Sequence, residues 1–299
     1  MKKILITGVN GLLGQKLMAL LAHQFEVVAT AKQPSPKLSI PKIPYFKLDI
    51  TKTRQCRDLI QKVKPDFIIN AASFTQVDAC EEEKELCWQV NVKGVENLAE
   101  AARRTMSLLI HLSTDYLFDG TEGPYEEDHL PRPLGYYGKS KLASENAVRK
   151  VGIPYAIVRT NVLYGTGIGV KNNFFLWVYS TLKSDKPINV VTDQYNNPTF
   201  VDDLAEGIKL LIEGSRYGLY NIAGKEYVNR YDFAQKLART FGFSESLIHP
   251  LTTDQLQQKA PRPLKGGLKI DRAQKELGYQ PRSLVETFRI LKAELEAGE

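Results

Sequence analysis

The chain has 299 residues, of which 43% are hydrophobic and 25% are charged, and its formal net charge is +6. These values are typical of a folded globular protein with a sizeable core, organised as one large domain or two smaller ones. Its basic residues are scattered among acidic ones and form no stripe, which argues against nucleic-acid binding and suits a small phosphate-bearing ligand.

The cysteines and the N-terminal residues indicate the cellular compartment in which the protein works. Cys56, Cys80 and Cys87 contain no CxxC pair, and no histidine stands at metal-ligand spacing from them. We therefore expect reduced thiols and no bound metal. The N-terminal apolar run is shorter than a signal peptide requires, and no later stretch approaches membrane-spanning length. We expect a cytoplasmic protein without a membrane partner.

From the N-terminus, short apolar runs alternate with amphipathic segments. Strands are predicted at 3–7, 26–31, 45–50, 67–71, 108–113 and 155–160. Helices are predicted from the leucine stripe that ends at Leu21, at 51–63 with Thr51 as cap, at 84–104 and around Tyr137. This alternation predicts an α/β fold with a Rossmann-type doubly wound parallel sheet.

After Gly165 the alternation loosens. Helices are predicted near 173–182, 202–212 and 230–241, with strands at 188–191 and 220–222. We expect a dinucleotide-binding domain at 1–165, to which 188–215 returns. The remaining segments, 166–187 and 216–299, are expected to form a smaller C-terminal α/β domain that binds the substrate.

Gly8, Gly11 and Gly14 form a GxxGxxG pattern that follows a predicted strand and opens a predicted helix. Glycine lets backbone amides approach a pyrophosphate, and the helix N-terminus offers unpaired N–H groups to it. The alternative is an ordinary strand–helix turn, but this context favours a dinucleotide site. The predicted cofactor contacts here are Gly8, Asn10, Gly11, Leu12, Leu13 and Gly14.

The ends of the next strands bear on which dinucleotide binds. The second strand ends in Lys32 and offers no acid for a ribose 2′-hydroxyl, so a 2′-phosphate and hence NADPH is favoured, with NADH as the alternative. Asp49, with Ile50, could hold the adenine amino group or serve a turn. The fourth strand ends in the small residues Asn70-Ala71-Ala72, which would let a flat cofactor pass close above the backbone.

Tyr137 and Lys141 are four residues apart and would share one helix face. A neighbouring ammonium favours phenolate and would lower the tyrosine pKa, so that Tyr137 could exchange a proton with a substrate oxygen. Thr114 ends a strand whose carboxyl end lies at the same edge, and its hydroxyl could bind the reacting oxygen. His111 lies inside that strand and is expected to be a core residue. No histidine is arranged as in a hydrolytic triad.

Together these residues resemble the extended short-chain dehydrogenase/reductases and, more narrowly, the dTDP-4-dehydrorhamnose reductase family. The most specific run is Thr114-Asp115-Tyr116-Leu117-Phe118-Asp119-Gly120. Sugar-nucleotide dehydratases of the superfamily have an acid directly after the Thr-Asp pair, and Tyr116 in that place disfavours dehydration. Further matches are Gly8–Gly14, Asn70-Ala71-Ala72 followed by Thr75 and Val77-Asp78, Tyr137–Lys141, Arg159-Thr160 and 190–199.

The resemblance implies that NADPH delivers hydride to C4 of a nucleotide-linked 4-keto-6-deoxy sugar. By the family's roles, Tyr137 protonates the carbonyl oxygen, Lys141 lowers the phenol pKa and holds the nicotinamide ribose, and Thr114 binds the keto group. It also implies a homodimer. The substrate contacts that we expect are Thr75, Val77, Asp115, Tyr116, Asn173 and, for the diphosphate, Arg262.

Two departures from the family pattern concern the sugar rather than the reaction. Gly135-Tyr136 stand where the family usually has Asn-Val, and Val162 stands where it often has Trp. Two other functions stay open at this point. One is a non-catalytic NADP-binding partner, similar to the regulatory subunit of methionine adenosyltransferase. The other is a nucleotide-sugar epimerase.

Overall fold

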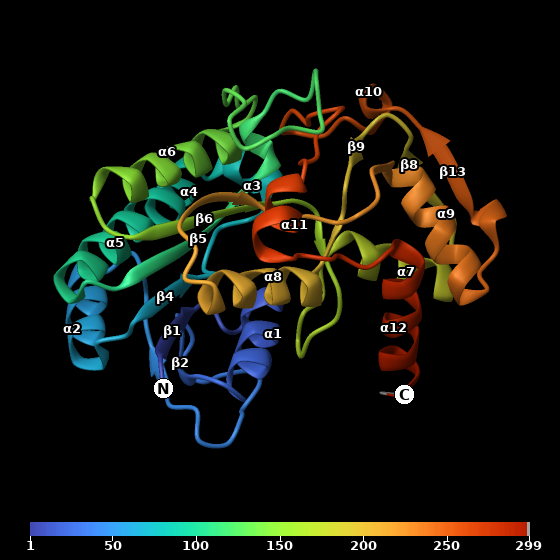
Figure 1. The fold of residues 1–299 in the computed structure, drawn as a ribbon. Coiled ribbons are helices and arrows are strands. Elements are labelled where there is room, and N and C mark those ends of the chain that lie inside the picture. The colour runs from blue at the N-terminus through green and yellow to red at the C-terminus, as the bar shows by residue number, and fades with distance from the viewer. Residues whose placement is uncertain (298–299) are drawn as a thin grey trace.

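A parallel sheet forms the centre of the structure, a computed structural model that describes residues 1–297 (Figure 1). Its strands are β1 (Lys3–Thr7), β2 (Glu26–Ala31), β3 (Tyr45–Lys47), β4 (Phe67–Asn70), β5 (Leu108–Thr114), β6 (Tyr155–Thr160) and β11 (Gly218–Asn221). They lie in the order β11-β6-β5-β4-β1-β2-β3, and each neighbouring pair is parallel. The predicted Rossmann-type sheet is confirmed, with its switch point between β1 and β4.

Helices cover both faces of this sheet, and its strands are therefore apolar on both sides. Ile4 and Ile6 of β1 pack in one core, whereas Leu5 between them packs in a second core. The first core contains residues of α1 (Leu12–Leu21) and α8 (Val201–Glu213). The second contains residues of α2 (Thr53–Val63), α5 (Gly94–Thr105) and α6 (Tyr136–Lys150).

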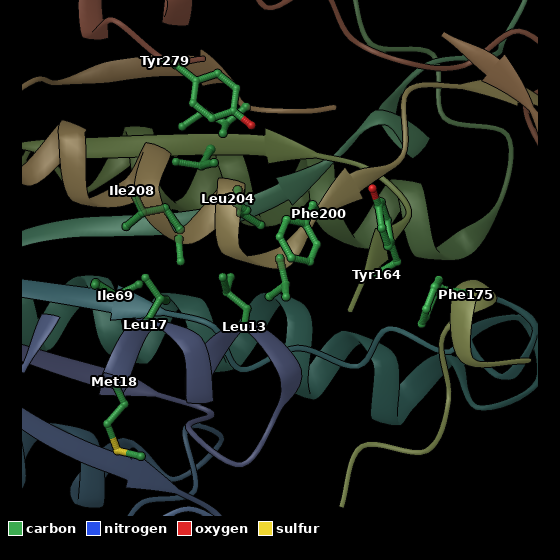
Figure 2. Packing of buried hydrophobic residues seen from close by; sticks show 14 of the residues in the cluster. Leu13, Leu17, Met18, Ile69, Tyr164, Phe175, Phe200, Leu204, Ile208 and Tyr279 are labelled. Carbon is green, nitrogen blue, oxygen red and sulfur yellow. The ribbon is translucent and has the colours of Figure 1, made fainter. Parts of the chain in front are cut away.

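The first core also connects distant parts of the chain. Figure 2 shows Leu13 and Leu17 of α1 close to Leu204 and Ile208 of α8, beside Ile69 of the sheet. These leucines belong to the stripe that predicted α1. Their burial holds the glycine turn that precedes α1 against the sheet.

A smaller unit follows β6 (Figure 1). It contains the strand pairs β8–β13 and β9–β12, and its helices pack through an aromatic cluster in which the Phe233 ring lies 4.9 Å from that of Phe288. Besides α8 and β11, the helices and strands after β6 are β7 (Leu163–Tyr164), α7 (Phe174–Lys183), β8 (Ile188–Val191), β9 (Tyr195–Asn196), β10 (Thr199–Phe200), β12 (Val228–Asn229), α9 (Arg230–Phe241), β13 (Ile248–Leu251), α10 (Thr253–Leu256), α11 (Asp271–Leu277) and α12 (Leu284–Ala297).

Two strands pair in sheets other than those that the domain prediction implied. We expected 188–215 to return to the first domain, but β8 within it pairs with β13. We assigned 216–299 to the smaller domain, but β11 pairs with β6 in the large sheet. An apolar run predicts a strand without saying which partner the strand will pair with. The domain division as a whole stays a prediction.

The segment predicted as one helix at 84–104 is interrupted. Before α5 the chain forms α3 (Val77–Glu82), α4 (Lys84–Trp88) and a wide π-helical turn at Gln89–Lys93. Asn91 lies in that turn, where its amide accepts from Phe74 N at 2.8 Å and donates to Phe74 O at 3.0 Å. Periodicity does not reveal such a turn, because a side chain bound to a distant backbone sets it.

The segment after β2 also differs from the prediction. The strand expected at 45–50 ends at Lys47, and the helix expected from Thr51 begins at Thr53. Thr51 does not cap α2, because its hydroxyl and its backbone N–H both donate to Asp49 Oδ1. The carboxylate thereby forms a turn between strand and helix.

Among residues 1–297, no helix has both the length and the apolar character that crossing a membrane demands.

Leu17→Ala tests the packing of α1 against α8. Leu17 is fully buried, so this truncation should lower the free energy of unfolding by about 2–5 kcal/mol. Leu86→Ala is the matched control, because Leu86 is 40% exposed. Its truncation should lower the free energy of unfolding by less than about 1 kcal/mol. Denaturant unfolding monitored by circular dichroism measures both. Equal costs would contradict the described packing.

Candidate active site

The glycine turn between β1 and α1 depends on close backbone contacts. Gly8 has φ +68°, and a Cβ placed on it would lie 2.8 Å from Ala71 O. A Cβ on Gly14 would lie 2.4 Å from Gly8 O, and Gly11 N donates to that same oxygen at 2.9 Å. A side chain at Gly8 would therefore push the turn away from Ala71 and Ala72 on the neighbouring strand end, and one at Gly14 would push α1 away from the turn itself.

The first turn of α1 offers its amides to an anion. Gly11 is the N-cap and has no side chain with which to cap them, and the turn contains no acidic residue. The N–H groups of Leu12 and Leu13 lie before the first intrahelical bond. The helix dipole adds partial positive charge at the same place. The structure thus brings together the predicted phosphate-binding residues, although Leu13 contributes only its backbone, because its side chain is in the core.

Asn10 shapes the loop that follows β2. Its Nδ2 donates to Gln33 Oε1 and to Ser35 O, both at 3.1 Å, and its Oδ1 accepts from Lys37 N at 2.8 Å. The amide is therefore engaged by the protein itself. Asn10 positions the loop that borders the site rather than pointing a free group into it.

Lys32 and Asp49 meet at the ends of β2 and β3. Their charged atoms are 3.6 Å apart, with the Lys32 side chain 70% exposed and that of Asp49 only 16% exposed. Burial raises the pKa of Asp49, but the hydrogen bonds from Thr51 and the charge of Lys32 outweigh it and lower that pKa overall. The side chain of Ile50 is buried in the core, so only the backbone of this residue can contact a ligand.

Thr114, Tyr137 and Lys141 converge where β5 ends and α6 begins. Their exposed fractions are 5%, 9% and 3%. The Thr114 hydroxyl accepts from Tyr116 N at 3.2 Å and lies near enough to the Tyr137 phenol to lower its pKa. Gly138 allows this arrangement, because a Cβ on it would lie 2.2 Å from Tyr116 O. The helix therefore lies directly on the chain that leaves β5. The predicted catalytic residues are brought together in one buried cluster.

The charge state of this cluster differs from the sequence-based expectation. Burial raises the pKa of Tyr137 above its ordinary value, Cys80 and Tyr116 add to that effect, and the Thr114 hydroxyl opposes it. Burial also lowers the pKa of Lys141 to about 8. We expected Lys141 to lower the phenol pKa, but desolvation dominates within the protein. A protonated phenol at neutral pH suits a proton donor.

Lys141 is held from two sides. Its ammonium donates to Leu112 O at 2.6 Å, and Glu145, one helical turn further on, raises its pKa against the effect of burial. Glu145 is fully buried and forms a bidentate pair with Arg159, both contacts at 2.9 Å. Sequence reasoning did not identify Glu145, although its four-residue spacing from Lys141 was a usable signal.

Two arginines border the opposite side of the cluster. Burial raises the pKa of Tyr116, and the charges of Arg262 and Arg230 lower it. Burial raises the pKa of Asp115 to about 6, while Gly267 N donates to Oδ2 at 3.1 Å and the charge of Arg230 acts in the opposite direction. Arg230 was not predicted as a site residue, because only the fold brings the start of α9 to this place.

The other predicted substrate residues are distributed around this cluster. Arg262 donates to Asp78 Oδ2 at 2.7 Å, so its charge is partly satisfied within the protein. Thr75 is exposed and Val77 is half-buried, in the segment that follows β4. Asn173 caps α7, accepting from Leu176 N and donating to Gly165 O, and its amide is thus committed to the fold.

Comparisons with known proteins identify the family of the chain. The family described as the RmlD substrate binding domain matches residues 1–295. The chain belongs to this family. The match confirms the resemblance inferred from the motifs.

Relatives of this family are similar to the chain over nearly its whole length. A dTDP-4-dehydrorhamnose reductase of Aggregatibacter actinomycetemcomitans is 33% identical, over 98% of this chain and 99% of the relative. The crystal structure of the Bacillus anthracis dTDP-4-dehydrorhamnose reductase in complex with NADP is 32% identical, has a TM-score of 0.88 and covers 98% of this chain and 100% of that one. Methionine adenosyltransferase 2 subunit beta of Xenopus laevis is 31% identical, over 92% of this chain and 82% of the relative.

Gly8→Ala tests the close contact beneath the glycine turn. The new side chain is strained by the left-handed φ and overlaps Ala71 O and Ala72 N. The free energy of unfolding should therefore fall by about 3 kcal/mol or more. Gly152→Ala is the control, because Gly152 has φ +74° but nothing within 4 Å of its Cβ position. Only the φ penalty of about 1–2 kcal/mol is expected there. Similar losses in chemical denaturation would refute the contact.

Proposed function

We propose that the chain reduces the 4-keto group of a nucleotide-linked 6-deoxy sugar with NADPH, as a dTDP-4-dehydrorhamnose reductase-like enzyme. The observation that carries the proposal is the convergence of Thr114, Tyr137 and Lys141 at the end of β5. That end lies at the same edge of the sheet as the glycine turn at Gly8. The family membership of the chain supports it.

The residues of the glycine turn fit a dinucleotide. Gly8 and Gly14 leave no room for a Cβ, and the first amides of α1 are free of side-chain caps. NADPH, when bound, supplies the hydride that adds to the carbonyl carbon. Lys32, exposed at the end of β2, is the residue that we assign to its 2′-phosphate, with Asp49 beside it.

The protein's own part in the reaction is proton delivery and orientation. Tyr137 donates its phenolic proton to the carbonyl oxygen as negative charge develops there, so that the ketone becomes an alcohol. Thr114 is placed to hydrogen-bond the same oxygen and to stabilise that charge. Lys141 uses one of its three N–H donors on Leu112 O, which leaves two for the cofactor ribose and for stabilising the phenolate that forms.

Arg230 and Arg262 are the residues that we assign to the diphosphate of the substrate. The pKa of Arg230 is lowered mainly by burial, and the nearby charge of Arg262 lowers it further. Two cations that repel each other beside Tyr116 favour a ligand with two negative charges. Guanidinium groups also match phosphate oxygens in geometry.

A regulatory role is the second candidate, since methionine adenosyltransferase 2 subunit beta is among the similar proteins. The assembled trio of Thr114, Tyr137 and Lys141 favours an enzyme. An epimerase that retains NAD is disfavoured, because β2 is followed by Lys32 and offers no acid for the ribose 2′-hydroxyl of NAD. A homodimer and a cytoplasmic location remain predictions from the family resemblance and the composition.

Tyr137→Phe should reduce kcat about a hundredfold or more, because the variant keeps the ring and loses the proton. Tyr217→Phe is the control, because Tyr217 is 53% exposed and precedes β11, and its turnover should stay near that of the unaltered protein. NADPH oxidation at 340 nm measures both rates, and quenching of protein fluorescence measures cofactor binding. A Tyr137→Phe enzyme with near-normal turnover would rule out this proton donor.

Lys32→Ala should weaken NADPH binding about tenfold and leave NADH binding nearly unchanged, because only the 2′-phosphate needs the cation. Lys47→Ala, which removes a nearby exposed cation from β3, controls for the general loss of positive charge. Titration of each variant with both cofactors provides the comparison. An equal effect of Lys32→Ala on NADPH and NADH would refute this assignment.

A panel of 4-keto nucleotide sugars, assayed by NADPH oxidation, tests the function itself. Turnover with a dTDP-linked 4-keto-6-deoxy sugar would support the proposal. Tight NADPH binding without turnover of any member would favour the regulatory role.

A further inference from the structure

A chain of buried hydrogen bonds runs beneath the candidate active site from β4 to α6. Asn70 Nδ2 lies 3.3 Å from His111 Nδ1, and His111 Nε2 lies 2.9 Å from Ser144 Oγ. Ser144 Oγ in turn donates to Lys141 O at 2.7 Å. Asn70, His111 and Ser144 are at most 1% exposed. His111 was expected as a core residue, and it is buried, with both ring nitrogens paired as a buried imidazole requires.

The direction of each bond in this chain follows from its first member. Asn70 Oδ1 accepts from Thr7 Oγ1 at 2.7 Å and from Ala72 N at 3.3 Å, so the carbonyl side of the amide faces those two donors. Asn70 Nδ2 is then the donor to His111 Nδ1, which must carry a lone pair. The ring proton therefore lies on Nε2 and is donated to Ser144 Oγ. The imidazole is neutral, in agreement with the burial and the nearby Lys141 charge that lower the pKa of His111.

The two ends of this series of hydrogen bonds lie at the two halves of the candidate active site. At one end are Ala72 and Thr7, and Thr7 directly precedes Gly8 of the glycine turn. At the other end is the backbone carbonyl of Lys141. The ammonium of Lys141 is bound to Leu112 O, next to His111 in β5. Lys141 is thus fixed by its main chain and by its side chain to the same short stretch of one strand.

We propose that His111, as the Nε2–H tautomer, is a positioning residue that sets α6 and its Lys141 relative to the cofactor-binding strand ends. This inference rests on the proposed function, in that it treats the distance between Lys141 and the glycine turn as important for hydride transfer. An apolar side chain would fill the same volume but would leave Asn70 Nδ2 and Ser144 without their partner. A small displacement of a catalytic group lowers turnover more than it lowers binding.

His111→Phe and Ser144→Ala test the chain by turnover. Each should lower kcat about tenfold, with the KM for the nucleotide sugar changed by less than about twofold. The double variant should lose little more than either single variant, because both break one chain. Losses that multiply in the double variant would overturn the proposal. His111→Gln, which keeps a donor and an acceptor, should recover part of the loss.

Ser107→Ala is the matched control for a merely structural effect. Ser107 is also fully buried and donates to a backbone carbonyl, that of Pro65, but it precedes β5 at the far edge of the sheet. It should lower the unfolding midpoint as Ser144→Ala does while leaving kcat unchanged. If Ser107→Ala lowers kcat as strongly, stability alone explains the effect and the proposal fails.

A measurement without substrate separates this inference from the proposed function. The ¹⁵N shifts of His111 in the full chain at pH 7 should show a protonated Nε2 and an unprotonated Nδ1. The opposite tautomer or a charged ring would overturn the inference whatever the enzyme reduces. Absence of turnover in the unaltered protein, with the expected tautomer present, would instead count against the proposed function alone.

Discussion

The close packing of α6 against the end of β5 is the contact on which the rest of the site depends. Gly138 lies so close to Tyr116 O that any side chain there would lift the helix. Because the helix is held down, Tyr137 reaches Thr114 and the ammonium of Lys141 reaches Leu112 O. A helix displaced by one carbon atom would separate the proton donor from the hydroxyl that shares its target. The site is therefore built on a steric limit rather than on a strong attraction.

Burial then decides how the ionisable groups behave. Lys141 and Glu145 lie in the same turn of α6 with almost no exposed surface, and Arg159 pairs with Glu145 from β6. Isolated charges at this depth would be costly, and the opposite charges reduce that cost. Burial raises the pKa of Tyr137, and Cys80 and Tyr116 add to that effect, so the phenol keeps its proton at neutral pH. One region of the protein thus contains an ammonium whose pKa is lowered by burial and a phenol that keeps its proton.

The sequence predicted the parts of this arrangement that depend on local pattern. The strand at Tyr155–Thr160 and the helix at Arg230–Phe241 were placed correctly, because periodicity and turn residues mark them. The motif residues Gly8, Thr114, Tyr137 and Lys141 were singled out by their spacing and strand-end positions, and their functional roles stay predictions. Arg230, the π-helical turn around Asn91 and the partner of β8 were missed, because each depends on contacts between segments far apart in the chain. The pKa of Tyr137 was misjudged because a spacing shows which charge is near but not how much water is excluded.

The position of β11 at the edge of the large sheet has a consequence for any attempt to divide the molecule. The chain leaves the sheet after β6, builds part of the smaller unit, and comes back with α8 and β11 before it departs again. A fragment that stopped at residue 165 would turn β6 into an unpaired edge and would uncover Leu13 and Leu17 to water. Such an edge pairs readily with other chains. The cofactor-binding half is thus not a detachable module but a structure completed by α8 and β11, both downstream of that cut.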